Sequence, residues 1–123
     1  MYNSIVMDHF KNPLNVGEIE NADGIGIVGS ASCGDILKIY LKIKDDIIID
    51  AKFQTFGCAA AIATSSVATE MLKGKNIKDA LKITNAEVVE KLEGLPPQKI
   101  HCSVLAEETI KKAIEDYISR KSQ

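Results

Sequence analysis

Several features typical of other protein classes are missing from this sequence of 123 residues. No apolar run approaches the roughly 20 residues that a membrane-spanning helix needs, so we expect no membrane association. The formal net charge is −2, and the chain therefore lacks the positive charge typical of nucleic-acid-binding proteins. The N-terminus also lacks the basic stretch and apolar core of a signal peptide. These absences favour a cytoplasmic protein that binds neither nucleic acid nor membrane.

Cysteine is also scarce. The chain has three, Cys33, Cys58 and Cys102, and they lie far apart. A secreted protein held together by disulfides normally has an even and denser set. We therefore expect reduced thiols, for which metal binding and sulfur chemistry are the candidate roles.

The hydrophobic pattern predicts a single α/β (α+β) domain over residues 1–123. Apolar residues alternate in two segments, 37–44 and 47–56, with Asp45-Asp46 as a tight turn between them. A weaker strand is predicted at 25–30. Together these segments predict a three-stranded antiparallel sheet. On the third strand we expect one buried face, made of Ile47, Ile49, Ala51 and Phe53.

Helices are predicted to cover one face of this sheet. A capping-box pattern at Thr84 to Glu87 marks one helix start, and Gly74 and Gly94 are suited to helix ends. The segment 95–99 contains two prolines and is expected to be extended and exposed. The predicted helices are 3–10, 59–73, 76–83, 84–94 and a long C-terminal helix from 103 onward.

Five side chains could act as metal ligands. Cys33 and Asp35 form a C-x-D triplet, which on its own is better explained by a buried cysteine and a turn aspartate than by a metal site. Cys58 and Cys102 fall at predicted helix starts, where free amide groups favour a thiolate. His101 adjoins Cys102, although a lone histidine is often a surface or capping residue. If these segments meet at one end of the sheet, the side chains could hold Zn²⁺ or an iron–sulfur cluster.

Two other interpretations of the same residues remain open. A zinc-binding structural or interaction module would need only the thiols and one further ligand. A cysteine-nucleophile enzyme would use Cys102, His101 and Asp35, but the sequence contains no signal for an oxyanion hole.

Four segments resemble one known family, and the resemblance extends from residue 2 to about residue 117. They are 7–17 (MDHFKNPLNVG), 32–35 (SCGD), 56–59 (FGCA) and 95–103 (LPPQKIHCS). In their order and spacing they are similar to IscU and the N-terminal domain of NifU, which are iron–sulfur cluster assembly scaffolds. The resemblance implies a non-enzymatic scaffold that builds a labile [2Fe–2S] cluster from iron and persulfide sulfur and passes it to apo-proteins.

The resemblance also implies roles for the five residues. Cys33, Cys58 and Cys102 would be cluster ligands and sulfur acceptors, with Cys102 as the principal persulfide acceptor. Asp35 would keep the cluster labile, and His101 would be a fourth or exchanging ligand. Zinc would occupy the same site in the cluster-free form.

The partners implied by the resemblance are a cysteine desulfurase and apo iron–sulfur acceptor proteins, together with a ferredoxin, a frataxin-like protein and Hsp70/J-type chaperones. The chaperone segment would be Leu95, Pro96, Pro97, Gln98 and Lys99, in which Gln98 replaces the usual valine. A second departure is Ala59, where the family commonly has glycine. The short spacing before the last motif, and His101, differ from the related SufU proteins.

Overall fold

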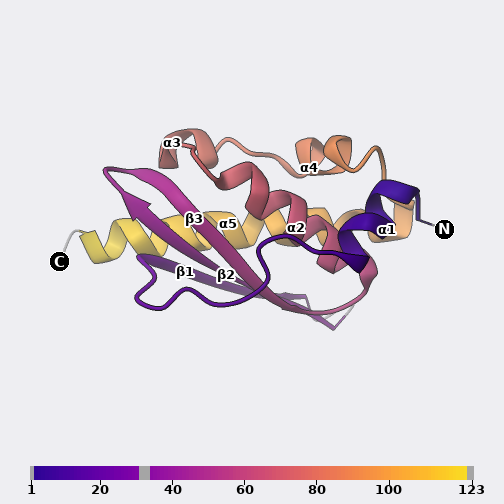
Figure 1. Cartoon of the computed structure of the whole chain (residues 1–123), viewed down its shortest axis with the longest axis horizontal. Coiled ribbons are helices and arrows are strands. Elements are labelled where there is room, and N and C mark those ends of the chain that lie inside the picture. The colour runs from indigo at the N-terminus through magenta and orange to yellow at the C-terminus, as the bar shows by residue number, and fades with distance from the viewer. Residues whose placement is uncertain (1, 31–33, 122–123) are drawn as a thin grey trace.

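The sheet has three antiparallel strands in the order β1-β2-β3. A computed structural model describes residues 2–30 and 34–121. The strands are β1 (Gly24–Ser30), β2 (Asp35–Lys44) and β3 (Ile47–Phe56). Figure 1 shows them as one twisted sheet. The predicted three-stranded antiparallel sheet is confirmed.

The turn between β2 and β3 is tight. Asp45 and Asp46 both have left-handed backbone angles, with φ of 53° and 62°. Two successive left-handed residues are the geometry of a two-residue hairpin loop, and aspartate tolerates it better than most side chains. This turn was predicted correctly.

The predicted buried face of β3 is wrong in its first half. Ile48 is fully buried, whereas Ile49 is 53% exposed. The register with β2 shifts between Lys42 and Ile43, which is a β-bulge. One extra residue in a strand moves the following side chains to the opposite face, and Ala51 and Phe53 are buried as predicted.

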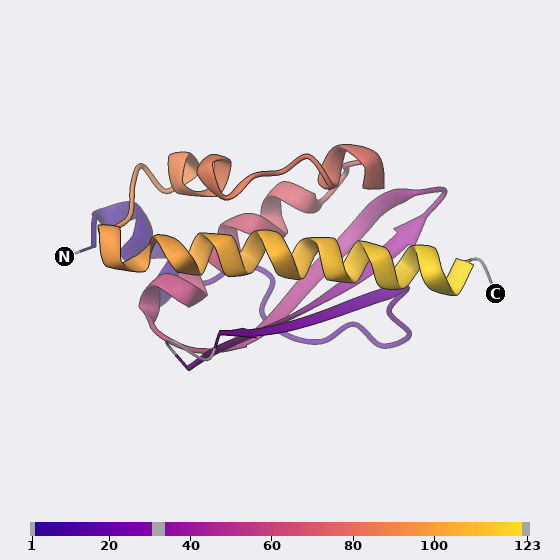
Figure 2. The same ribbon diagram turned by 180° about the vertical axis from the view of Figure 1, so that it is seen from behind.

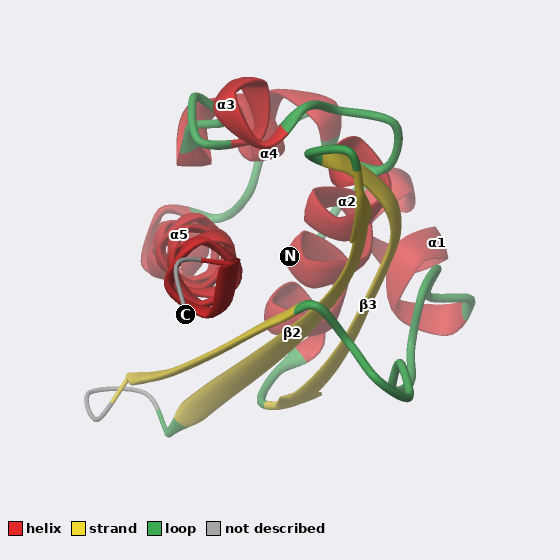
Figure 3. Ribbon diagram, turned by 90° about the vertical axis from the view of Figure 1, so that its left-hand side faces the viewer, coloured by secondary structure: helices red, strands yellow, loops and turns green. Residues whose placement is uncertain are grey.

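Two long helices, α2 (Ala59–Leu72) and α5 (Ile100–Lys121), cover one face of the sheet (Figure 3). Beyond them α3 and α4 form an outer layer, while α1 packs on α2. Figure 2 shows α5 running along the length of the molecule. No helix in the described part of the chain combines the length and the apolar character needed to cross a membrane. The helices are α1 (Ser4–Lys11), α2 (Ala59–Leu72), α3 (Ile77–Ala80), α4 (Asn85–Lys91), the 3₁₀ turn η1 (Pro97–Lys99) and α5 (Ile100–Lys121).

The region before the last helix differs from the prediction. The capping box of Thr84 and Glu87 is present at the start of α4. However, Pro97–Lys99 is a 3₁₀ turn, not an extended segment, because proline is well suited to the first position of a helix. The turn leads directly into α5, which therefore begins at Ile100 and not at Ser103. As a result, His101 and Cys102 lie within the first turn of α5.

Two glycines of β1 let α5 pack directly against the strand. A Cβ atom at Gly24 would lie 2.4 Å from the carbonyl oxygen of Ala113. One at Gly26 would lie 2.5 Å from the amide nitrogen of Ala113 and 2.6 Å from the carbonyl oxygen of Thr109. These distances are far below van der Waals contact, so any larger residue would push the helix away from the sheet.

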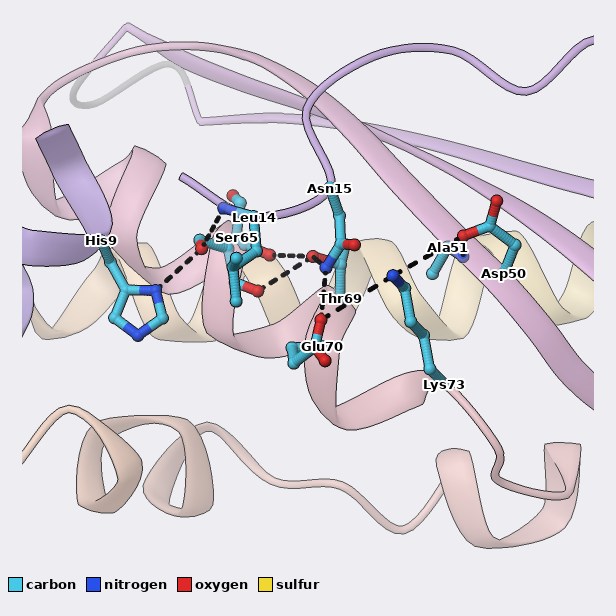
Figure 4. Close-up of polar contacts among 10 residues, drawn as sticks. His9, Leu14, Asn15, Asp50, Ala51, Ser65, Thr69, Glu70 and Lys73 are labelled. Atoms are coloured by element: carbon cyan, nitrogen blue, oxygen red, sulfur yellow. Dashed lines mark hydrogen bonds and ion pairs between the residues drawn. The ribbon is translucent and has the colours of Figure 1, made fainter. Parts of the chain in front are cut away.

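The N-terminal segment is fastened to α2 by polar side chains (Figure 4). The hydroxyl oxygen of Ser66 lies 2.8 Å from Nδ1 of His9 and accepts a 2.9 Å hydrogen bond from the amide of Leu14. The Asn15 side chain donates to Glu70 at 3.0 Å, and the Asn15 carbonyl accepts from the amide of Phe53. The segment is thereby tied to both a helix and a strand.

Candidate metal centre

Three side chains from different elements meet at one end of the sheet. Asp35 is the first residue of β2, Cys58 is the N-cap of α2, and Cys102 lies in the first turn of α5. One ligand atom from each lies within 4.8 Å of the others. The predicted convergence of these residues is therefore present.

The distances suit a shared metal ion. The sulfur atoms of Cys58 and Cys102 are 3.9 Å apart. Ligands placed tetrahedrally at a zinc–sulfur distance of about 2.3 Å are separated by about 3.8 Å. Oδ2 of Asp35 lies 3.6 Å from the Cys102 sulfur, close to the same spacing. The donor set therefore fits Zn²⁺ or the iron of a cluster.

His101 stands at the rim of this group. Its Nε2 atom is 3.6 Å from the Cys102 sulfur and 3.7 Å from Oδ2 of Asp35. The imidazole is 39% exposed, whereas the Asp35 side chain is 4% exposed. His101 can therefore reach the same metal ion from the solvent side.

The two cysteines differ in their surroundings. Cys102 is 1% exposed and packs with Ala60 and Ala61, whereas Cys58 is partly exposed. Burial, and secondly the neighbouring Cys58, raise the pKa of the Cys102 thiol well above its ordinary value. The prediction that the helix start favours a Cys102 thiolate is therefore wrong for the metal-free protein, because burial outweighs it.

Two further side chains flank Cys58. The charge interaction with Cys58 is the main cause that raises the pKa of Lys99. Burial, followed by Cys58, raises the pKa of Tyr2. Lys99 was predicted only as part of a chaperone segment, and Tyr2 had no motif to draw attention to it. Both lie next to the more accessible thiol of the centre.

The remaining predicted residues are only partly placed. Cys33 lies outside the described residues. In the proline segment, Leu95 packs against the buried group around Cys102, and Pro97 and Gln98 are exposed. Of the five predicted ligands, the structure thus brings together Asp35, Cys58, His101 and Cys102.

The comparisons with known proteins agree with this site. The chain is 60% identical over 123 residues to the "Iron-sulfur cluster assembly scaffold protein IscU 1" of Archaeoglobus fulgidus, covering all of this chain and 80% of that protein. It is 51% identical over 124 residues to the IscU scaffold protein of Escherichia coli, covering 98% of this chain and 96% of the relative.

Solved structures have the same fold. The crystal structure described as a putative scaffold protein for the SUF system from Fervidobacterium islandicum has a TM-score of 0.79 at 26% identity, covering 92% of this chain and 96% of that one. A NifU-like N-terminal structure from Brucella abortus has a TM-score of 0.77 at 19% identity, covering 96% of this chain and 94% of the other, and shows the fold alone. The NifU-like N terminal domain family matches residues 1–123, and the chain belongs to that family.

Proposed function

We propose that this chain is a scaffold on which an iron–sulfur cluster is assembled and from which it is passed to other proteins. The observation that carries the proposal is the meeting of Asp35, Cys58 and Cys102 within 4.8 Å at one end of the sheet. The names of the similar proteins, which describe iron–sulfur cluster assembly scaffolds, support it.

The cargo is proposed to be a [2Fe–2S] cluster. Cys58 and Cys102 supply two thiolates, and Cys33 is proposed as the third. Cys33 is two residues from Asp35 in the sequence, and two residues of chain span at most about 7 Å. Asp35 or His101 completes the set, and Zn²⁺ is proposed to bind the same side chains in the cluster-free form.

Asp35 is proposed to keep the cluster labile. A carboxylate oxygen is a harder ligand than a thiolate and holds thiophilic iron less tightly. Four cysteines would make a closed and permanent site, whereas a mixed set suits a cluster that has to leave. Asp35 is 3% exposed and faces Cys102, so it is in position for this role.

Sulfur is proposed to arrive on Cys102 from a cysteine desulfurase. The Cys102 thiolate attacks the outer sulfur of the donor persulfide, a new S–S bond forms, and the desulfurase thiolate leaves. The Cys102 proton must be removed first, and Oδ2 of Asp35 and Nε2 of His101, each 3.6 Å from the sulfur, are the nearby acceptors. Because Cys102 is 1% exposed, the rim formed by His101 has to move aside during this step.

The other partners are proposals of the same kind. Apo iron–sulfur proteins would receive the cluster, and a ferredoxin and a frataxin-like protein would assist its assembly. Pro97 and Gln98 are exposed and could contact an Hsp70 chaperone with its J-type partner. The polar Gln98 makes that contact less apolar than valine would.

The test is anaerobic incubation of the protein with ferrous iron, cysteine and a cysteine desulfurase, followed by visible absorption. We expect sulfide-to-iron charge-transfer bands that elute with the protein. A zinc-binding module would instead retain Zn²⁺ and develop no bands, and that outcome would overturn the scaffold proposal.

A further inference from the structure

We propose that Gly57 is a positioning residue, whose missing side chain leaves the space in which the Asp35 carboxylate lies beside the thiols. This inference rests on the proposed function, because it concerns the residue that is proposed to make the cluster labile. Gly57 itself offers no ligand atom and acts only through Asp35.

The geometry around Gly57 is unusually close. A Cβ atom at this position would lie 2.5 Å from Oδ1 of Asp35 and 2.9 Å from its Cγ. The other carboxylate oxygen, Oδ2, faces Cys102 at 3.6 Å and His101 at 3.7 Å. The carboxylate is therefore held between Gly57 on one side and the two α5 side chains on the other.

The backbone of Gly57 does not explain why glycine occupies this position. The described glycines with left-handed φ angles are Gly17, Gly34, Gly74 and Gly94, and Gly57 is not among them. An alanine could adopt the same backbone conformation. An alanine side chain would, however, displace the Asp35 carboxylate from its position.

A substitution at Gly57 moves the carboxylate more easily than the fold. The two closest atoms belong to the end of the Asp35 side chain, and the third neighbour is Cβ of Ala61 at 3.0 Å. A side chain can rotate, whereas the backbone at the start of α2 is fixed by the helix. The Cys102 sulfur, 3.6 Å from Oδ2, leaves little space on that side, so we expect the carboxylate to rotate away from the ligand group. Gly57→Ala should therefore have the same effect on the cluster as Asp35→Ala, although the aspartate itself is still present.

The experiment compares wild type, Asp35→Ala, Gly57→Ala and the double variant. Each protein is loaded with a cluster under anaerobic conditions, and its lifetime is followed in the presence of an iron chelator. We expect Asp35→Ala and Gly57→Ala each to lengthen the lifetime roughly tenfold, the lower end of the effects seen when a residue next to metal ligands is changed. The double variant should have the same lifetime as Asp35→Ala alone.

The control is Gly29→Ala, whose added Cβ would be 3.7 Å from its nearest neighbour, Cγ1 of Ile36. It should have the wild-type lifetime. A merely loosened fold would shorten the lifetime of Gly57→Ala, and a wild-type lifetime would mean that the carboxylate has not moved; either result overturns the inference. If Gly57→Ala fails to fold but the double variant folds, the clash is with the carboxylate and the inference stands. If neither folds, it is overturned.

Failure of the proposed function can be told apart from failure of this inference. If wild type forms no cluster, the scaffold proposal fails, and the four proteins are then compared by the absorption spectrum of bound Co²⁺. Co²⁺ bound with an oxygen ligand and Co²⁺ bound without it have different visible absorption bands. The same spectral change in Gly57→Ala and Asp35→Ala supports the positioning role, and a wild-type spectrum for Gly57→Ala overturns it.

Discussion

The two ends of α5 lie in contrasting polar environments. At its C-terminal end, the Tyr117 hydroxyl and the Lys121 ammonium donate to the Asp46 carboxylate at 2.7 and 2.9 Å. At its N-terminal end, about 22 Å away along the helix, Cys102 lies 3.6 Å from Asp35 and 3.9 Å from Cys58. The C-terminal end therefore has short hydrogen bonds from two donors to one carboxylate. The N-terminal end has longer contacts among a carboxylate and two thiols, all of which are acidic groups.

This difference separates a structural cluster from a binding site. Asp46 meets a hydroxyl and a cation of its own chain, so its charge is compensated when the chain folds. Asp35, Cys58 and Cys102 all become anions when they lose protons, and bringing them together is unfavourable unless a cation joins them. The close spacing of these three side chains would lower the stability of the fold by itself, but it is suited to binding a metal ion.

The largest effect is expected from Cys58→Ser. Serine is a favoured N-cap residue, so α2 should still begin at the same place. The hydroxyl does not ionise at neutral pH and is a poor ligand for zinc or iron. We expect Zn²⁺ affinity, measured by competition with a chromophoric chelator, to fall by more than about 100-fold, the upper end of the loss for an outer-shell partner.

The matched control for Cys58→Ser is Lys121→Gln, which removes a charge at the opposite end of α5. Its Zn²⁺ affinity should equal that of wild type. If wild type, Cys58→Ser and Lys121→Gln all bound Zn²⁺ with equal affinity, the proposal that only the N-terminal end of α5 binds metal would be wrong.

A smaller effect is expected from Gly26→Ala, which acts on the packing of α5 against β1 between these two ends. The added Cβ would collide with the α5 backbone at Thr109 and Ala113. Overpacking of this kind costs about 2 kcal/mol, even though alanine would otherwise limit the unfolded chain more than glycine does. Urea denaturation should show this loss of the free energy of unfolding. Gly29→Ala, which meets no close neighbour, should be unchanged or slightly stabilised, and equal effects at both positions would contradict the packing argument.

The smallest effect is expected from Asp46→Asn. The hydrogen bond from Tyr117, followed by that from Lys121, lowers the pKa of Asp46 below its ordinary value of 3.8. A lowered pKa in the folded state adds stability above that ordinary value, and this is lost as the pH falls through the folded pKa. Asparagine tolerates the left-handed turn, so only the charge changes.

Urea midpoints of wild type and Asp46→Asn should therefore differ slightly at pH 7 and converge in strong acid. A difference that stays constant from pH 7 to about pH 2 would show that the carboxylate charge contributes nothing.

The sheet was predictable because branched apolar residues recur at every second position of β2 from Leu37 to Ile43. The face of β3 was not, since Ile47, Ile48 and Ile49 are equally apolar and only the bulge opposite Ile43 decides which is buried. Similarly, motifs marked Asp35, Cys58, His101 and Cys102, but no pattern could indicate that Tyr2 lies beside Cys58. Cys33 stays a prediction. Contacts between distant segments depend on the packed fold and not on local spacing.

The Ser66 hydroxyl, which joins His9 and Leu14 to α2, has a consequence for local unfolding. One buried oxygen contacts both the helix α1 and the chain that follows it, so the two segments are anchored at the same point of α2. The N-terminal segment should therefore open as one cooperative unit. Tyr2 belongs to that unit, and its departure would uncover Cys58 without any movement of the sheet.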